Sequence, residues 1–227
     1  MTKIYPVIHH ANNAQAAEQA EIALDAGCDG VFLISHTGNN TALLPLANRL
    51  KSMSITAGRP FDIGVNLLGV EADLALRVAG LFKLDMVWLD KSGIGASGFD
   101  LTGRALVNAW NALPADERPI VFAGVAFKYQ PDEPNPPMAA SFAAGAGFVP
   151  TTSGPGTGHA PDIRKILEMS QATDKRLAIA SGMSVDNVAD FSPYLSHVLV
   201  ATGVSRNESE FDYELLLAFV AKVRGTR

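Results

Sequence analysis

Five residues with ionisable or amide side chains follow or end short apolar runs of the sequence. They are His9, His36, Asn66, Asp90 and Lys128. Carboxylate, imidazole and amine groups at such positions can exchange protons with a bound molecule. Histidine changes its charge close to neutral pH, so His9 is predicted to act as a proton shuttle. Asp90 is predicted to act as a general base or as a partner of a substrate hydroxyl.

Two lysines suggest a second chemistry. Lys128 directly follows the apolar run "IVFAGVAF", and Lys91 follows Asp90. A lysine with a lowered pKa can form a Schiff base, whereas a surface lysine only keeps its charged end in water. Successive residues of a strand point to opposite faces, so only one of Asp90 and Lys91 can face the interior, and we expect Asp90 there.

Three loops combine glycine with hydroxyl side chains, and they lie at 151–162, 180–188 and 201–209. Glycine allows the backbone to approach a ligand closely, and free N–H groups at helix starts bind phosphate. An alternative is that these residues only turn the chain. The predicted phosphate-binding residues are Ser181, Gly182, Thr202, Gly203 and Ser205, and the predicted substrate loop contains Thr152, Ser153, Gly154, Thr157 and Gly158.

The elements that carry these residues alternate between apolar strands and amphipathic helices. This pattern predicts parallel strands joined by helices. Eight repeats favour an α/β fold, a single (β/α)8 TIM barrel spanning 1–227, over an open sheet, because no G-x-G-x-x-G follows the first strand. The strands are expected at 3–10, 30–35, 61–68, 85–90, 119–128, 147–152, 176–181 and 197–202, and the helices at 14–27, 41–53, 71–82, 103–113, 136–145, 162–172, 184–195 and 210–223. The glycine-rich segment 91–103 is expected to form a flexible lid.

Composition narrows the partners of the chain. A net charge of −5 without a basic run argues against nucleic acid binding. The sequence has no apolar run of membrane-spanning length and no secretion signal, so we expect a cytoplasmic protein without a membrane partner. The lone Cys28 excludes an internal disulfide and is expected to be a small buried residue. We expect no cofactor and no metal; a homo-oligomer stays open.

The segments "YPVIHH", "DAGCDGVFLIS", "FDIGVNLL", "TTSGPGTGHAPD", "ASGMSVDNV" and "VLVATGVS" together resemble the BtpA/SgcQ family. That family belongs to the ribulose-phosphate-binding barrel group, and the resemblance implies a phosphate-binding barrel. The segments "HHANNAQAA" and "ISHTGNN" depart from the family pattern at two loops that face the substrate, which implies a different substrate.

The sequence therefore predicts an enzyme that acts on a small phosphorylated metabolite, such as a ribose phosphate or a nucleotide-derived compound. Isomerase, lyase and phosphoribosyl or glycosyl transfer chemistry by general acid–base catalysis remain open, because one barrel supports many reactions. The alternatives are a Schiff-base aldolase that uses Lys91 or Lys128, and a non-catalytic phosphate-ligand-binding or assembly factor.

Overall fold

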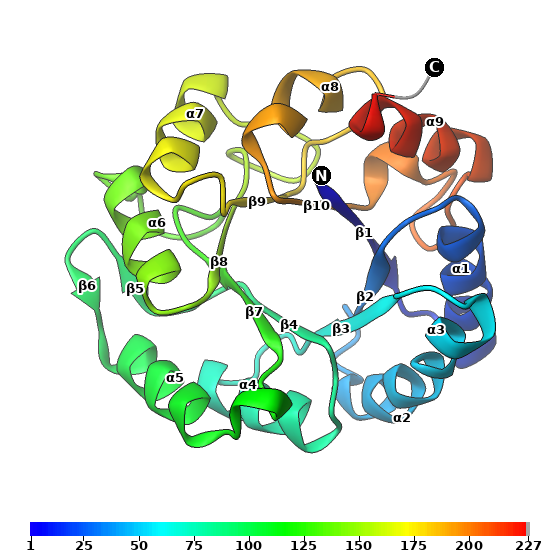
Figure 1. The fold of residues 1–227 in the computed structure, drawn as a ribbon, viewed down its shortest axis with the longest axis horizontal. Helices are drawn as coiled ribbons and strands as arrows, with labels where there is room; N and C mark the ends of the chain where they lie inside the picture. Colours follow the sequence, from blue (N-terminus) through cyan, green and yellow to red (C-terminus); the bar gives the residue numbers. More distant parts are fainter. Residues whose placement is uncertain (226–227) are drawn as a thin grey trace.

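The computed structural model describes residues 1–225, and within them eight parallel strands close into a barrel surrounded by helices (Figure 1). The predicted (β/α)8 fold is thereby confirmed. Around the barrel the strands run in the order β1-β10-β9-β8-β7-β4-β3-β2, so β10 lies directly across from β4. The barrel strands are β1 (Lys3–His9), β2 (Gly30–Ile34), β3 (Asp62–Asn66), β4 (Met86–Leu89), β7 (Ile120–Gly124), β8 (Val149–Thr152), β9 (Ala178–Ala180) and β10 (His197–Val200).

The helices follow the strands and pack on the outside of the barrel. They are α1 (Asn13–Asp25), α2 (Asn40–Leu50), α3 (Ser52–Ala57), α4 (Ala72–Leu81), α5 (Leu101–Ala112), α6 (Pro136–Gly145), α7 (Ile163–Ala172), α8 (Val188–Phe191) and α9 (Tyr213–Arg224), with 3-10 turns η1 (Ala115–Glu117), η2 (Ser192–Tyr194) and η3 (Thr202–Val204). Side-chain caps fix the first turns of several helices. Asp162 caps α7 by accepting from the N–H of Arg164, and Asn135 caps α6 by accepting from the N–H of Met138. No helix in the part of the chain described here is long and apolar enough to cross a bilayer.

Three segments differ from the sequence prediction. The helix expected at 41–53 is divided into α2 and α3, and the helix expected at 184–195 contains only the four α-helical residues of α8 followed by η2. Pro193 lies in that second region, and it lacks the N–H that a continuing helix needs. The segment 91–103 contains a small antiparallel hairpin of β5 (Ile94–Gly95) and β6 (Gly98–Phe99) that the sequence analysis did not predict, and its role as a lid stays a prediction.

Aromatic rings fill the barrel interior. Tyr5, Phe32 and Phe122 are fully buried, and their rings meet edge to face with centroids 5.2–5.9 Å apart. The expectation that Cys28 is buried is confirmed, because none of it is exposed. The rings close the lower part of the barrel, so space for a ligand is left at the other end, where the strands terminate.

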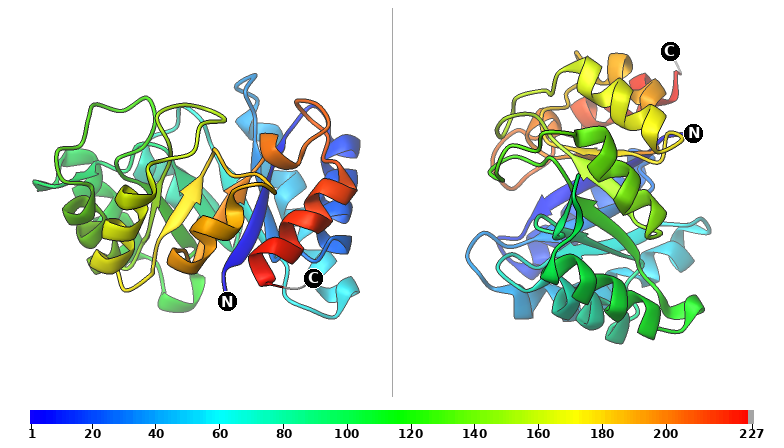
Figure 2. Two further views of the ribbon diagram at one scale, coloured as in Figure 1. Left: turned by 90° about the horizontal axis from the view of Figure 1, so that it is seen from above. Right: turned by 90° about the vertical axis from the view of Figure 1, so that its left-hand side faces the viewer.

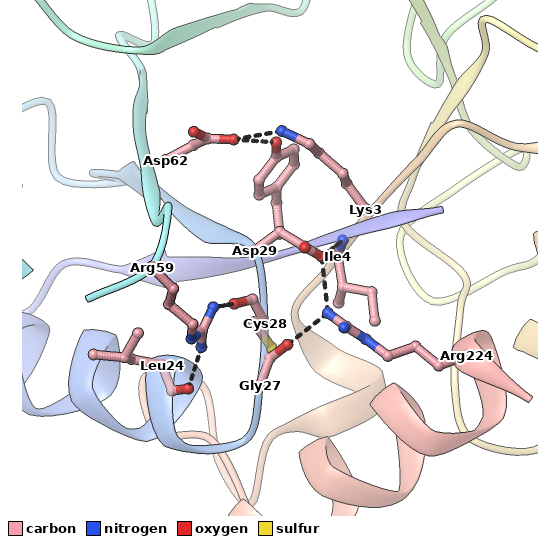
Figure 3. A network of polar contacts seen from close by, with 10 residues as sticks. Lys3, Ile4, Leu24, Gly27, Cys28, Asp29, Arg59, Asp62 and Arg224 are labelled. Atoms are coloured by element: carbon pink, nitrogen blue, oxygen red, sulfur yellow. Dashed lines mark hydrogen bonds and ion pairs between the residues drawn. The ribbon is translucent and has the colours of Figure 1, made fainter. Parts of the chain in front are cut away.

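A network of charged groups holds the end of the barrel at which β1 begins (Figure 3). Asp62 Oδ2 accepts from Lys3 Nζ at 2.9 Å and from the Tyr5 hydroxyl at 2.6 Å. Asp29 Oδ2 lies 3.3 Å from Arg224 Nη2, which joins the last helix to the second strand. Figure 2 shows the N-terminus at the edge of the barrel away from the long loops that follow the strands.

His197 is a largely buried titratable group at this end, beside the fully buried Tyr5. Its ring stacks on Tyr5 and meets Phe122 edge to face, and Nδ1 lies 2.8 Å from Ser196 Oγ. Burial, with a smaller contribution from the charge of Lys3, lowers the pKa of His197 from 6.5 to about 4. The imidazole is therefore neutral in the folded protein at neutral pH.

This burial predicts an acid-sensitive fold. Between the two pKa values the unfolded chain binds more protons than the folded chain, so stability falls as the pH drops from 6.5 towards 4. The full contribution is on the order of 3 kcal/mol. In urea unfolding at a series of pH values, His197→Phe is expected to flatten this part of the profile, while the loop variant His159→Gln keeps it. An unchanged slope in His197→Phe would contradict the assignment.

Candidate functional site

A cavity of about 480 Å³ opens at the ends of the barrel strands. Its volume falls within the range of small-molecule sites. Residues at the ends of seven strands and in the loop after β8 contribute to its lining. Among the residues predicted from the sequence, His9, His36, Asp90, Lys128, Thr157, Gly158, Ser181, Gly182, Thr202 and Gly203 line this cavity.

The other predicted residues lie outside the lining. Thr152 and Ser153 are fully buried, and Thr152 Oγ1 donates to the Ala126 carbonyl at 3.0 Å. Gly154 packs against the His159 carbonyl, which would lie 2.0 Å from an added Cβ. Ser205 Oγ donates to the Ala201 carbonyl at 2.9 Å and lines a neighbouring groove, and Asn66 lies behind Asp90. These residues bond or pack against groups next to the cavity without lining it.

Four backbone N–H groups on one side of the cavity form what we call the rim amides: those of Gly182 and Met183 after β9 and of Thr202 and Gly203 after β10. Within residues 1–225 none of them donates a hydrogen bond to the protein. Neighbouring N–H groups left free in this way form a concave site for an anion. The rim amides therefore provide the feature that phosphate binding requires.

Backbone geometry keeps the rim amides free. Ser181 and Gly182 both have positive φ, 90° and 79°, a conformation that costs energy for serine. Asn187 fixes this turn, because its amide nitrogen donates to the Gly182 carbonyl and its oxygen accepts from the Ser184 N–H, each at 2.9 Å. A Cβ at Gly203 would lie 2.0 Å from the Met183 carbonyl oxygen. The two turns therefore contact each other where only glycine fits.

The glycine loop at 151–162 lies against both sides of the mouth. The Gly158 N–H donates to Ser181 Oγ at 3.2 Å, beside the rim amides. On the other side, Thr157 Oγ1 lies 3.1 Å from Lys128 Nζ and 3.2 Å from the Tyr129 hydroxyl. The tip of the loop therefore joins the β7 side of the cavity to the β9 side.

Asp90 follows β4, across the barrel from the rim amides. Burial raises the pKa of Asp90, and the hydrogen bond from Asn66 Nδ2 to Oδ1, 3.0 Å long, opposes this effect. Gln130 Nε2 donates to the Asp90 backbone carbonyl and ties this strand end to the loop after β7. A carboxylate with a raised pKa in a cavity is suited to accept and return a proton.

Two histidines lie close together at the mouth. The rings of His9 and His36 meet edge to face with centroids 4.8 Å apart. Burial lowers the pKa of His9, and the nearby His36 lowers it further. His10 is on the other face of β1, where Nε2 lies 3.0 Å from Asn13 Oδ1. Among the described residues, no group of three or more histidine, cysteine, aspartate or glutamate side chains could hold a metal ion.

The two candidate lysines lie in different places. Lys128 lines the cavity, whereas Lys91 lines a groove outside it beside the β5–β6 hairpin. The alternation expected for Asp90 and Lys91 agrees with this arrangement. Schiff-base chemistry in the cavity would therefore use Lys128.

The sequence analysis did not identify three residues that lie at the cavity or next to it. Trp88 is only 7% exposed and yet lines the cavity, and so does Phe127. Strand periodicity could have placed Trp88, because it lies two residues before Asp90 and shares its face. Lys165 of α7 is half-buried and donates to the carbonyls of Ala126 at 2.8 Å and Ser153 at 3.0 Å. Burial lowers the pKa of Lys165 to about 8.

No protein-family model and no curated protein matches the sequence. Solved structures share the fold. Phosphoribosylanthranilate isomerase from Thermotoga maritima superposes with a TM-score of 0.65 at 17% identity over 99% of this chain and 100% of its own. The isomerase from Thermus thermophilus gives 0.65 at 15% identity over 100% of both chains. Phospho-2-dehydro-3-deoxyheptonate aldolase from Thermotoga maritima gives 0.62 at 15% identity over 99% of this chain and 68% of its own.

The contact between Asn66 and Asp90 generates a prediction that needs no substrate. Asn66 stabilises the charged carboxylate, so Asn66→Leu is expected to move the titration of Asp90 to higher pH. The carboxyl carbon of Asp90 can be followed by 13C NMR, with Asp90→Asn used to assign the signal. The surface variant Asn111→Leu serves as a matched control and should leave the titration unchanged. A downward shift in Asn66→Leu would show that the hydrogen bond does not act as described.

Proposed function

We propose that this barrel is an enzyme that binds a small phosphorylated metabolite and moves a proton on it. The supporting observation is the pairing of four free rim amides with a half-buried carboxylate on the opposite side of one cavity. The phosphate binds the amides of Gly182, Met183, Thr202 and Gly203. Asp90 then faces a part of the molecule away from the phosphate.

The catalytic roles follow from the ionisation of each group. Asp90 accepts a proton from the substrate, because burial raises the pKa of this carboxylate and makes it a better base. His9 stays neutral at pH 7, since burial lowers its pKa, and its N–H can donate to a substrate oxygen. Lys128 can pair with an anionic group at the mouth. A proton acceptor and a donor across one substrate are the requirements of an isomerase or a lyase.

The comparisons support this class of chemistry by analogy alone. The isomerases and the aldolase that share the fold are named for phosphorylated compounds. The resemblance to the BtpA/SgcQ family likewise implies a phosphate-binding barrel. The reaction itself is argued from the cavity, because proteins that share this fold carry out many different reactions.

Phosphate binding is tested at Gly203. Calorimetric titration of inorganic phosphate and of ribose 5-phosphate is expected to show saturable binding that Gly203→Ala weakens at least tenfold, since its Cβ would collide with the Met183 carbonyl and force the two turns apart. Gly145→Ala is the matched control, because a Cβ at Gly145 meets open space. Circular dichroism checks that both variants fold. A sulfate-soaked crystal with an empty rim would refute the phosphate site independently of the variants.

Proton transfer is tested at Asp90. In deuterium oxide, proton NMR of a panel of sugar phosphates and nucleotide-derived phosphates is expected to show exchange of one carbon-bound hydrogen in the compound that turns over. Asp90→Asn should slow this exchange by about 10²–10⁴-fold and leave phosphate affinity intact. Asp116→Asn, on the surface at η1, is the matched control.

Two outcomes would instead support the alternative functions, a Schiff-base aldolase or a non-catalytic binding protein. Borohydride trapping of dihydroxyacetone phosphate on Lys128 would assign Schiff-base chemistry. Tight phosphate binding without any turnover that depends on Asp90 or Lys128 would indicate a binding protein.

A further inference from the structure

Part of the cavity lining is apolar, and within it Trp88 of β4 and Leu68 after β3 lie across the barrel from the rim amides. Six side chains form this apolar part, and we call them the apolar wall: Val7, Ile34, Leu68, Trp88, Phe127 and Leu199. All except Leu68 belong to the packed cluster that fills the barrel interior, and Leu68 packs against that cluster. The wall is therefore the upper surface of the core, open to whatever molecule binds.

Trp88 and Phe127 dominate this wall. Their rings meet edge to face with centroids 6.0 Å apart, and Phe32 supports Trp88 from below at 6.0 Å. Trp88 Nε1 is shielded from solvent and has no acceptor among the residues that the structure describes. A phenylalanine would pack there without an unpaired donor. The indole therefore contributes ring surface at this position, not a hydrogen bond within the protein.

The backbone holds Phe127 in place. Ala126, the preceding residue, has a positive φ of 47°, which a side chain adopts only under constraint. Its carbonyl accepts from both Thr152 Oγ1 and Lys165 Nζ, at 3.0 Å and 2.8 Å. The Lys128 N–H donates to Ser153 Oγ at 2.8 Å on the other side of Phe127. Phe127 is thus fixed at the cavity by bonds on both sides of it.

We propose that the substrate carries a planar apolar group, an aromatic or heteroaromatic ring, at the end opposite its phosphate. This inference rests on the proposed function. The ring packs on Trp88, Phe127 and Leu68, and the reacting atom lies between ring and phosphate, beside Asp90. A bare sugar phosphate fits less well, because each hydroxyl buried against the wall without a partner would weaken binding by about tenfold or more.

The experiment compares two phosphate monoesters that differ in the group they carry. Phenyl phosphate and ribose 5-phosphate are titrated calorimetrically, with inorganic phosphate as the reference. Phenyl phosphate is expected to bind at least tenfold more tightly than ribose 5-phosphate. The chain has two tryptophans, so Trp110→Phe leaves Trp88 as the single emitter. In that variant, phenyl phosphate is expected to change the tryptophan fluorescence and inorganic phosphate to change it little.

Variants of the wall locate the effect. Phe127→Ala and Leu68→Asn should each remove most of the preference for phenyl phosphate and leave inorganic phosphate affinity unchanged. Leu68 is only partly buried, so Leu68→Asn provides a second test of the wall if Phe127→Ala does not fold. Phe142→Ala, an exposed aromatic of α6, is the matched control and should keep the preference.

The outcomes separate this inference from the proposed function. Equal affinity for the two esters, or a preference that survives in both wall variants, overturns the inference and leaves the phosphate site standing. Absence of binding by every phosphate overturns both.

Discussion

The site depends on one close contact, between the turn after β9 and the turn after β10. Gly203 lies so near the Met183 carbonyl that a Cβ would be 2.0 Å from it, and the preceding turn places Ser181 at a φ of 90°. Strained backbone of this kind costs about 1–3 kcal/mol and persists where the surroundings impose it. Here Asn187 imposes it, by bonding both sides of the first turn. The result is a group of N–H donors that the protein itself leaves unpaired.

The opposite end of the barrel supplies the stability that such a site needs. Asp62 bonds both Lys3 and the buried Tyr5 there, and Asp29 joins Arg224 of the last helix to the second strand (Figure 3). Above them the rings of the interior fill the barrel up to Trp88. The positive φ of Ser181 and the free rim amides thus lie at the ends of the strands, which is where barrels of this class carry their chemistry.

Short-range patterns in the sequence correctly predicted the order of strands and helices and the faces of neighbouring residues. Alternation of apolar runs and helical segments predicted the barrel, and the period of two along a strand correctly separated Asp90 from Lys91. The same patterns did not predict positions that are set by contacts with residues far away in the sequence. Thr152 and Ser153 lie below the mouth because they bond the backbone around Phe127, and Asn66 lies behind Asp90. The helix expected at 184–195 is mostly absent, because side-chain bonds from Asn187 hold its first part as a turn.

The glycine loop at 151–162 connects the two halves of the cavity. Its first residues, Thr152 and Ser153, bond the backbone on either side of Phe127 and so position the apolar wall. Its tip reaches the other half, where Gly158 bonds Ser181 next to the rim amides. A shift of this loop would therefore alter the grip on the phosphate and the fit of the rest of the substrate together. Its glycines let the chain cross the mouth closely, and its hydroxyl groups fix it at both ends, which explains why so polar and flexible a segment precedes α7.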